Sequence, residues 1–352
     1  MAAMLAAGSS AALAQASIGM DPDAPKDQRP IYGYGGQHRA AVPQALSGVI
    51  NSGNSDLMDQ IVSFGPSSGG VLATTTPFII SGVSRTQHDG FGIDSKYEDG
   101  RAPGFDATSY GFTPALRWDA SGLFGLPKGK VAMGVFGNYT HSDIDIKTSD
   151  ILQVANKLKA DNWSAGGFAM ATTGKIYVSG VVMGSFGSAD AVGQLLDTGH
   201  KIDTSGFSSA VTAGLLVPVS GNTKLDFSAK LNYANSATDN FVDHLSYSYT
   251  DSRVADLDGT LAAKLFTVIP DQNQTWRPFI QGGVTQRFFN TNEIKLEGCK
   301  FAFTDDDTTF FGRGGVDLEM GHSLQGFVAV RGDLNSDVSV VSGQAGLTWK
   351  LN

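Results

Sequence analysis

The feature that most constrains this chain is a repeated alternation of apolar and polar residues. Between 223 and 236, five apolar residues are each separated by one polar or charged residue: Leu225, Phe227, Ala229, Leu231 and Tyr233. Successive side chains of a strand point to opposite faces, so this period of two gives one strand an apolar face and a polar face. Stretches of this kind recur from residue 77 to the end, and each is long enough, at about ten residues, to cross a membrane as a tilted strand.

These stretches predict about twelve strands, at 77–89, 105–119, 129–142, 161–172, 174–187, 204–218, 223–236, 252–269, 275–289, 308–320, 323–333 and 338–351. Short turns at 172–175, 218–222, 270–274 and 320–323 alternate with long polar connections at 90–104, 143–160, 188–203, 237–251 and 290–307. Outer-membrane barrels show this asymmetry, with the short turns in the periplasm. A soluble β-sandwich would also produce alternating strands, but it has no reason to alternate the lengths of its connections. The predicted fold class is therefore all-β, a closed antiparallel transmembrane β-barrel of about twelve strands.

Composition supports this fold and excludes one class of partner. The chain has 44 Gly and 21 Phe among 352 residues and only 17% charged residues, which favours strands and tight turns. The net charge of −9 argues against nucleic acid, whose phosphates require a basic surface. The single cysteine, Cys299, cannot form an intramolecular disulfide, and we expect it to be a bystander in a long loop.

The region before the barrel divides into three parts. Residues 1–16 form an Ala-rich apolar run that ends Ala14-Gln15-Ala16, the small-x-small pattern of a signal-peptide cleavage site, although no Lys or Arg precedes the run. Residues 17–35 are polar and lack a period, which predicts a short disordered segment. Residues 36–70 form a helical linker, and the barrel occupies 77–352.

Two short helices are predicted in the linker, with Gly53 as the break between them and Pro43 near the start of the first. The apolar residues at helical spacing are Val42, Leu46 and Val49 in the first helix and Leu57, Met58, Ile61 and Val62 in the second. The linker could pack on the periplasmic rim or lie in the barrel lumen. We expect the lumen, where its apolar side would fill the space left by small inward residues and its polar groups would meet the charged lumen.

The polar faces of the predicted strands carry charges of both signs, which predicts a wet lumen with a network of opposite charges. The lumen-facing candidates are Arg117, Lys224, Asp226, Lys230, Arg277, Arg287, Arg313, Asp317, Glu319 and Lys350, and Asp119 joins them by its parity. These groups could simply solvate one another and the helix, or they could line a hydrated passage for an unfolded chain.

No catalytic residue, cofactor or metal site is predicted. His141-Ser142-Asp143 and Asp243-His244 could contribute to a triad, but no nucleophile elbow accompanies them. The acidic run Asp305–Asp307 lacks the alternating ligands and the glycine of a calcium loop. Arg331-Gly332-Asp333 matches a cell-adhesion tripeptide, a short match that begins inside a predicted strand.

The order of these parts resembles the translocator unit of classical monomeric autotransporters, the type V secretion proteins of Gram-negative bacteria. The resemblance covers roughly 36–352 and is most specific in GFDATSYGFTPALRWDASGLFG, WRPFIQGGVTQRF, FGRGGVDLEMGHSLQGFVAVRGD and the closing SGQAGLTWKLN. The closing strand also resembles the outer-membrane assembly signal, with Gln344, Gly346, Trp349 and Leu351 in its four places. Family members usually stop on Phe or Trp, whereas this chain has Leu351 followed by Asn352.

The resemblance implies a monomeric outer-membrane translocator that is not an enzyme and whose barrel termini are periplasmic. It also implies two partners, outer-membrane lipid and the barrel assembly machinery, and no cofactor. The short segment before the linker leaves room for little or no passenger. The alternative function is a porin-like channel or a surface adhesin that acts through its loops.

Overall fold

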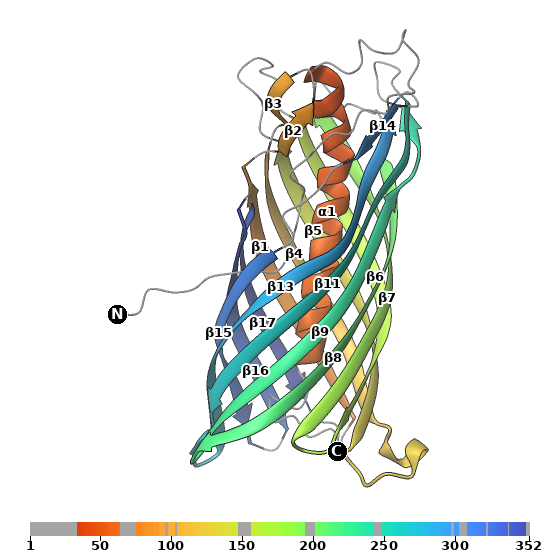
Figure 1. Cartoon of the computed structure of the whole chain (residues 1–352). Helices are drawn as coiled ribbons and strands as arrows, with labels where there is room; N and C mark the ends of the chain where they lie inside the picture. Colours follow the sequence, from red (N-terminus) through yellow and green to blue (C-terminus); the bar gives the residue numbers. More distant parts are fainter. Residues whose placement is uncertain are drawn as a thin grey trace, which may run out of the picture.

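The chain forms a closed antiparallel β-barrel around one α-helix (Figure 1). The structure is a computed structural model, and it describes residues 34–63, 75–89, 91–95, 98–102, 104–146, 156–193, 201–242, 248–296, 299–302, 308–321, 323–336 and 338–349. The predicted signal peptide, most of the predicted disordered segment, Lys350 and Leu351 lie outside these residues.

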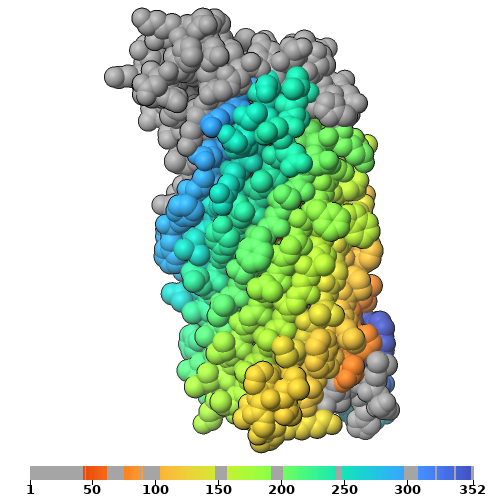
Figure 2. Space-filling view, turned by 90° about the vertical axis from the view of Figure 1, so that its right-hand side faces the viewer, coloured from red at the N-terminus to blue at the C-terminus, as the bar shows by residue number. Residues whose placement is uncertain are grey.

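Twelve long strands build the wall, which confirms the predicted fold class. They are β1 (Thr76–His88), β4 (Phe105–Asp119), β5 (Val131–Ile146), β6 (Asn156–Thr172), β7 (Ile176–Gly193), β8 (Ile202–Ser220), β9 (Thr223–Thr238), β11 (Ser248–Thr267), β13 (Gln274–Leu296), β15 (Thr308–Met320), β16 (Leu324–Leu334) and β17 (Val338–Trp349). Figure 2 shows one side of this wall, where successive strands follow one another diagonally in sequence order.

The first and last strands close the barrel. β1 pairs antiparallel with β17, from Phe78 opposite Thr348 to His88 opposite Val338. On its other side β1 pairs with β4, so every long strand has two neighbours. Since a closed sheet has no free edge, all its strand N–H and C=O groups can be paired inside the wall, as a lipid environment requires.

The strands extend further toward the long connections than the sequence predicts. β5 continues to Ile146, β6 begins at Asn156 and β13 continues to Leu296, so the connections at this end are shorter than expected. The sequence pattern does not indicate these extensions, because their outward residues are charged and break the alternation of apolar and polar residues. Lys157 and Asp145 are such a pair, exposed and 2.9 Å apart between Nζ and Oδ1. Such residues read as loop in a sequence, although the backbone ladder continues above the apolar band of the wall.

Shorter elements complete the two ends of the barrel. At the long-connection end lie a hairpin of β2 (Phe91–Ser95) and β3 (Glu98–Ala102), and the short strands β10 (Phe241–Val242) and β14 (Cys299–Ala302). Cys299 thus begins a strand rather than lying within a loop. At the turn end lie the 3-10 helix η3 (Ser121–Phe124) and β12 (Ile269–Asp271). Asp119, expected in the lumen network, instead accepts hydrogen bonds from Ser121 and from the Gly129 N–H, and so holds the η3 turn.

The outer face of the wall is apolar and the inner face packs against the helix. Large apolar side chains are exposed on successive strands: Val135, Val182, Leu215, Leu231, Leu261, Ile280, Val328 and Val341. Within the described part of the chain, no helix has the length and hydrophobicity needed to cross a membrane.

Several inward aromatic rings lie over glycines of neighbouring strands. An added Cβ at Gly315 would lie 2.7 Å from the ring of Phe279, and one at Gly283 would lie 2.5 Å from the ring of Phe311. The ring of Phe168 covers Gly134 in the same way. These glycines leave room for rings that lie flat against the wall, a close approach that any side chain would block.

Candidate functional site

Among the described residues the lumen contains one continuous helix, α1 (Tyr34–Ser63), where two were predicted. Its N-terminal end lies at the long-connection end of the barrel and its C-terminal end at the turn end (Figure 1). The predicted break at Gly53 is wrong, and Pro43 lies well inside the helix. A glycine costs a helix only about 1 kcal/mol relative to alanine, and packing inside the barrel outweighs that cost. Gly53 faces open space, because nothing lies within 4 Å of a Cβ built on it.

One polar stripe of α1 binds the wall through hydrogen bonds. Ser47, Asn51, Ser55 and Asp59 recur every four residues and therefore lie on one helix face. The Ser47 hydroxyl is 3.2 Å from the Thr238 hydroxyl, Asn51 Nδ2 donates to Asp256 at 3.3 Å, and Asn232 Nδ2 donates to the Ser55 hydroxyl at 3.4 Å. On the adjoining face Asn54 Nδ2 donates to the Ser185 hydroxyl at 3.3 Å. The stripe thus contacts β9 and β11 over about three and a half turns of the helix, and Asn54 adds a contact with β7.

The stripe ends in an ion-pair cluster around Asp59. Lys230 Nζ lies 2.6 Å from Asp59 Oδ1, and Arg331 Nη1 lies 2.9 Å from Asp59 Oδ2. Arg331 also pairs with Asp333, with 3.3 Å between Nε and Oδ1. One helix carboxylate therefore joins two strands, β9 and β16, that are far apart in the sequence.

Next to this cluster the lumen is apolar, which differs from the wet, charged lumen that the sequence predicts. Leu57, Met58 and Ile61 of α1 form one buried cluster with inward side chains of the turn-end half of the wall, among them Phe78, Ile80, Phe136, Phe168, Met170, Phe266, Phe279 and Phe327. The rings of Phe78 and Phe168 meet edge to face, with centroids 6.1 Å apart. Inward positions near the other end are also apolar and buried, as at Ile144, Leu158 and Ile294. The helix is therefore a part of the barrel's hydrophobic core as well as of its polar network.

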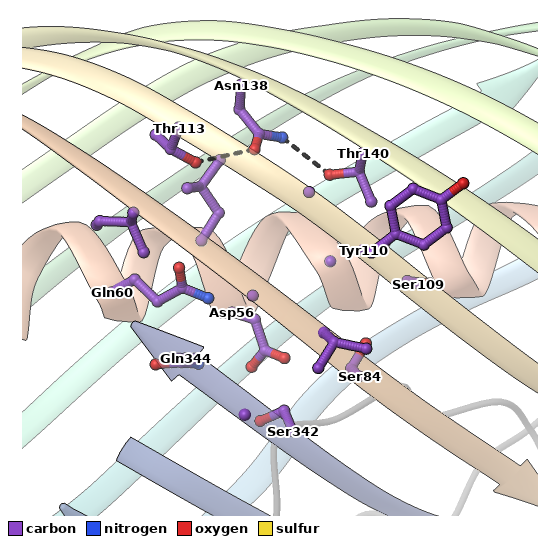
Figure 3. A pocket seen from close by; sticks show the side chains of 17 residues that line it. Asp56, Gln60, Ser84, Ser109, Tyr110, Thr113, Asn138, Thr140, Ser342 and Gln344 are labelled. Carbon is purple, nitrogen blue, oxygen red and sulfur yellow. Dashed lines mark hydrogen bonds between the residues drawn. The ribbon is translucent and has the colours of Figure 1, made fainter. Parts of the chain in front are cut away.

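The face of α1 that carries Gly53, Asp56 and Gln60 borders a small polar cavity of roughly 60 Å³. Figure 3 shows Asp56 and Gln60 of the helix facing Gln344 and Ser342 of β17. Across the cavity Thr113 donates a hydrogen bond to Asn138 Oδ1 at 2.9 Å, and Asn138 Nδ2 donates to Thr140 at 3.1 Å. On this measure one water needs about 10 to 15 Å³, so this space holds a few waters.

The charged residues predicted to face the lumen differ in their contacts: some form ion pairs, some form hydrogen bonds with neutral side chains, and one is exposed. Arg277 pairs with Glu319 at 2.9 Å, Arg287 lies 3.4 Å from Asp258, and Asp317 lies 3.8 Å from Lys264 Nζ. Asp226 accepts a hydrogen bond from the Tyr177 hydroxyl at 3.1 Å, and Arg313 Nη2 donates to Gln344 Oε1 at 3.2 Å. Arg117 is buried, whereas Lys224 is exposed near the turn end of β9. Of the predicted assembly signal, Gln344 is buried, Gly346 pairs with Phe327 and Ile80, and Trp349 is exposed on the outside.

The sequence reasoning missed Lys264, Arg331, Asp333, Asp256 and Asp258 on the strands and Asp59 on the helix. Two signals could have found them. Arg331 and Asp333 share the inward parity of Phe327 on β16, and Ser47 to Asp59 repeat at four-residue spacing. The Arg331-Gly332-Asp333 match to an adhesion tripeptide does not lie on an accessible surface, because Arg331 and Asp333 are 6% and 4% exposed in the lumen.

The candidate triads do not assemble among the described residues. His141 faces outward, where its Nδ1 lies 2.8 Å from Asp161, while Ser142 is buried on the inner face and bonds Ser109. Adjacent strand residues point to opposite faces, so the Ser142 hydroxyl cannot reach His141. No cluster of three or more His, Cys, Asp or Glu suited to a metal is found in the part of the chain described, and Asp243, His244 and Asp305–Asp307 lie outside it.

Three solved structures share this architecture. They are the translocator domain of autotransporter NalP from Neisseria meningitidis (TM-score 0.62, 13% identity, 88% of this chain and 100% of that one), the β-domain of the Bordetella autotransporter BrkA (TM-score 0.57, 14% identity, 79% and 100%), and the transport unit of autotransporter AIDA-I from Escherichia coli (TM-score 0.58, 13% identity, 79% and 90%). No curated protein sequence matched the chain. At sequence identities of 13% to 14%, this likeness shows only that the fold is shared.

A family model carries the assignment further. The model of the autotransporter β-domain matches residues 89–351, which is most of the chain and nearly all of the barrel. Barrels of this family lie in the outer membrane of Gram-negative bacteria and serve type V secretion. The chain belongs to the autotransporter β-domain family, and it is an outer-membrane translocator barrel.

Proposed function

We propose that this barrel holds α1 in its lumen as the closed state of a translocator, with the passage shut by the helix itself. The observation that carries the proposal is the dual attachment of α1, whose Asp59 pairs with two strands while Leu57, Met58 and Ile61 pack into the inward Phe cluster. A passive pore would have no need to bury its own segment on both a polar and an apolar face. No enzymatic activity is part of the proposal.

We further propose that the turn end faces the periplasm and the long-connection end faces the cell surface. The asymmetry of connection lengths supports this orientation, since short turns are periplasmic in barrels of this class. The segment before α1 would then lie on the cell-surface side, and both ends of the barrel wall would lie in the periplasm. Whatever precedes residue 34, whether a short segment or a passenger, would be the exported part.

We propose two partners for this monomeric barrel. The exposed apolar side chains of the outer face fit outer-membrane lipid. The closing strand, with Gln344, Gly346, Trp349 and Leu351, fits recognition by the barrel assembly machinery, as the resemblance to the assembly signal implies.

Conductance in a planar lipid bilayer tests the closed state. We expect no steady ion conductance from the full chain and a steady open pore from a barrel that lacks residues 34–63. A full-length Asp59→Ala variant, which keeps the helix but loses its ion pairs, should open intermittently. The change in gel mobility on boiling would first establish that each variant is folded. A steady open pore in the unmodified chain would contradict the proposal and favour a porin-like channel, and a closed barrel after deletion would favour a surface adhesin.

A further inference from the structure

A second internal cavity, of roughly 80 Å³, borders Asp59 where the helix meets β7, β8, β9, β11, β13, β15 and β16. Four of its lining residues are cations, namely Lys230, Lys264, Arg313 and Arg331, and two are carboxylates, Asp59 and Asp226. The lining of this buried space is therefore more basic than acidic. This contrasts with the first cavity, whose lining includes Asp56 and no cation.

Three of the four cations have carboxylate partners. Lys230 and Arg331 share Asp59, at 2.6 and 2.9 Å, and Lys264 Nζ lies 3.8 Å from Asp317. The remaining cation is Arg313, which is 9% exposed. Among the described residues no carboxylate oxygen lies within 4.0 Å of its guanidinium; Nη2 donates to Gln344 and Nε has no partner.

The same cavity contains a second buried donor without a partner. Thr212 lines it, is 7% exposed, and its hydroxyl makes no hydrogen bond among the described residues. The carboxylates nearest to Arg313, those of Asp59, Asp317 and Asp56, act on its guanidinium from beyond ion-pair distance. A buried charge that no counter-charge touches is costly, and a buried donor without an acceptor adds to that cost. Water can accept from both donors, but it cannot neutralise the guanidinium.

We infer that this cavity binds one small inorganic oxyanion of the sulfate or phosphate class, held by the Arg313 guanidinium with the Lys264 ammonium and the Thr212 hydroxyl. Tetrahedral oxyanions accept several charge-assisted hydrogen bonds at once, which suits a guanidinium, an ammonium and a hydroxyl on one space. The volume suffices, since a single water needs only about 10 to 15 Å³ on the same measure. The anion would be enclosed as the barrel closes around α1.

Refolding the full chain into detergent micelles with and without sulfate tests this site and needs no entry path in the folded barrel. At constant ionic strength, set with a bulky organic anion, millimolar sulfate should raise the temperature at which the compact gel band is lost, and the rise should saturate. Phosphate should act alike, whereas chloride should act more weakly. An unsaturable effect shared by all salts would overturn the inference.

Matched variants assign the effect to the cavity. Arg313→Gln should raise the sulfate concentration for half of the effect at least about tenfold, the loss expected for one charge-assisted hydrogen bond. Arg277→Gln is the control, because Arg277 is a lumen guanidinium that pairs with Glu319 and does not line the cavity. Equal sulfate dependence of the two variants would contradict the site, and Lys264→Met replaces Arg313→Gln if the latter does not fold.

A crystal of the protein refolded with selenate gives a readout that depends on no variant. An anomalous selenium peak within hydrogen-bond reach of Arg313 and Thr212 is expected. Density for water alone, with no anomalous signal in the cavity, would refute the inference.

Discussion

At the scale of single residues, the Asp59 carboxylate of the helix forms ion pairs with two cations of the barrel wall. Its two oxygens each meet a different cation, Lys230 on β9 and Arg331 on β16. Both cations are largely shielded, with side chains 12% and 6% exposed. Removing the carboxylate would leave the shielded Lys230 without this ion pair, while Arg331 would keep its pair with Asp333.

Asp59→Ala should therefore lower the free energy of unfolding by about 3 to 5 kcal/mol, the usual cost of breaking a buried ion pair. Urea unfolding of the purified barrel, followed by tryptophan fluorescence, measures the change. Asp145→Ala is the matched control, since its pair with Lys157 is exposed and should be worth about 0 to 1 kcal/mol. Equal urea midpoints for Asp59→Ala and Asp145→Ala would show that the ion pairs of Asp59 do not stabilise the packing of the helix in the barrel.

The glycines beneath the aromatic rings give a second residue-scale prediction. Gly315→Ala adds a Cβ 2.7 Å from the Phe279 ring and 2.5 Å from the Val328 carbonyl, so the ring must leave its place. We expect a loss of about 1 to 3 kcal/mol, as for overpacked cores. Gly314→Ala, one residue earlier, meets nothing nearer than 3.9 Å and should be nearly neutral in the same unfolding measurement. A neutral Gly315→Ala would show that the ring has room to move.

At the scale of elements, α1 behaves as an interior element although its residues are of mixed polarity. Asn51 and Asn54 are 5% and 1% exposed, and Leu46 and Met58 are fully buried. A helix with one wet face would instead show apolar residues on one stripe only. One stripe of polar groups on α1 bonds the wall, and Asp56 and Gln60 border the small polar cavity, so both polar faces of the helix lie inside the barrel.

Proteolysis of the folded barrel should therefore spare the bonds between residues 50 and 55. The η3 turn provides an internal control, because Leu123 and Phe124 are 78% and 60% exposed at the turn end and should be cut first. Boiling should make 50–55 susceptible. Mass spectrometry of early fragments identifies the sites, and early cleavage near Gly53 would contradict a lumenal helix.

The closing strand gives a second prediction at this scale. Trp349→Asp places a charge on the outer face and should cost on the order of 1 to 4 kcal/mol, depending on its depth in the membrane. It should also lower the amount of barrel in the outer membrane if the assembly machinery reads this strand. Lys350→Gln, at the next position, should be tolerated. Immunoblots of membrane fractions measure the amount of each variant in the outer membrane. Wild-type amounts of Trp349→Asp would count against the proposed signal.

At the scale of the whole molecule, the ladder of strands is continuous around the barrel through the β1–β17 pair. Closed barrels of this kind unfold only when many strand pairs separate together. The protein should be extracted only by detergent, and the unboiled sample should migrate faster than the boiled one on a gel. Full solubility in buffer alone would refute a membrane-embedded barrel.

Much of this architecture could be predicted from the sequence, because a period of two fixes both the position and the facing of a strand. β4, β15 and β16 follow the predicted ranges within one residue at each end. The extensions of β5, β6 and β13 could not be predicted, since residues such as Lys157 and Asp145 are outward but polar above the apolar band. The polarity of an outward side chain depends on whether it meets lipid or water, whereas the backbone hydrogen bonds between strands form in both surroundings.

The interior was harder to predict than the wall. Phe136 and Phe279 face inward, so the rule that apolar residues face lipid fails where the lumen contains a core of its own. The continuity of α1 through Gly53 depends on packing that no local propensity encodes. Asp59, Lys230 and Arg331 lie far apart in the chain, and only the closed barrel brings them together.

The inward Phe cluster has a thermal consequence. Moving α1 out of the lumen would hydrate the rings that now pack on Leu57, Met58 and Ile61, so opening the passage resembles partial melting more than the swing of a hinged gate. Such a step carries a positive change in heat capacity. Since apolar burial weakens on cooling, chilled barrels should release their helix more readily than the strength of the ion pairs alone would suggest.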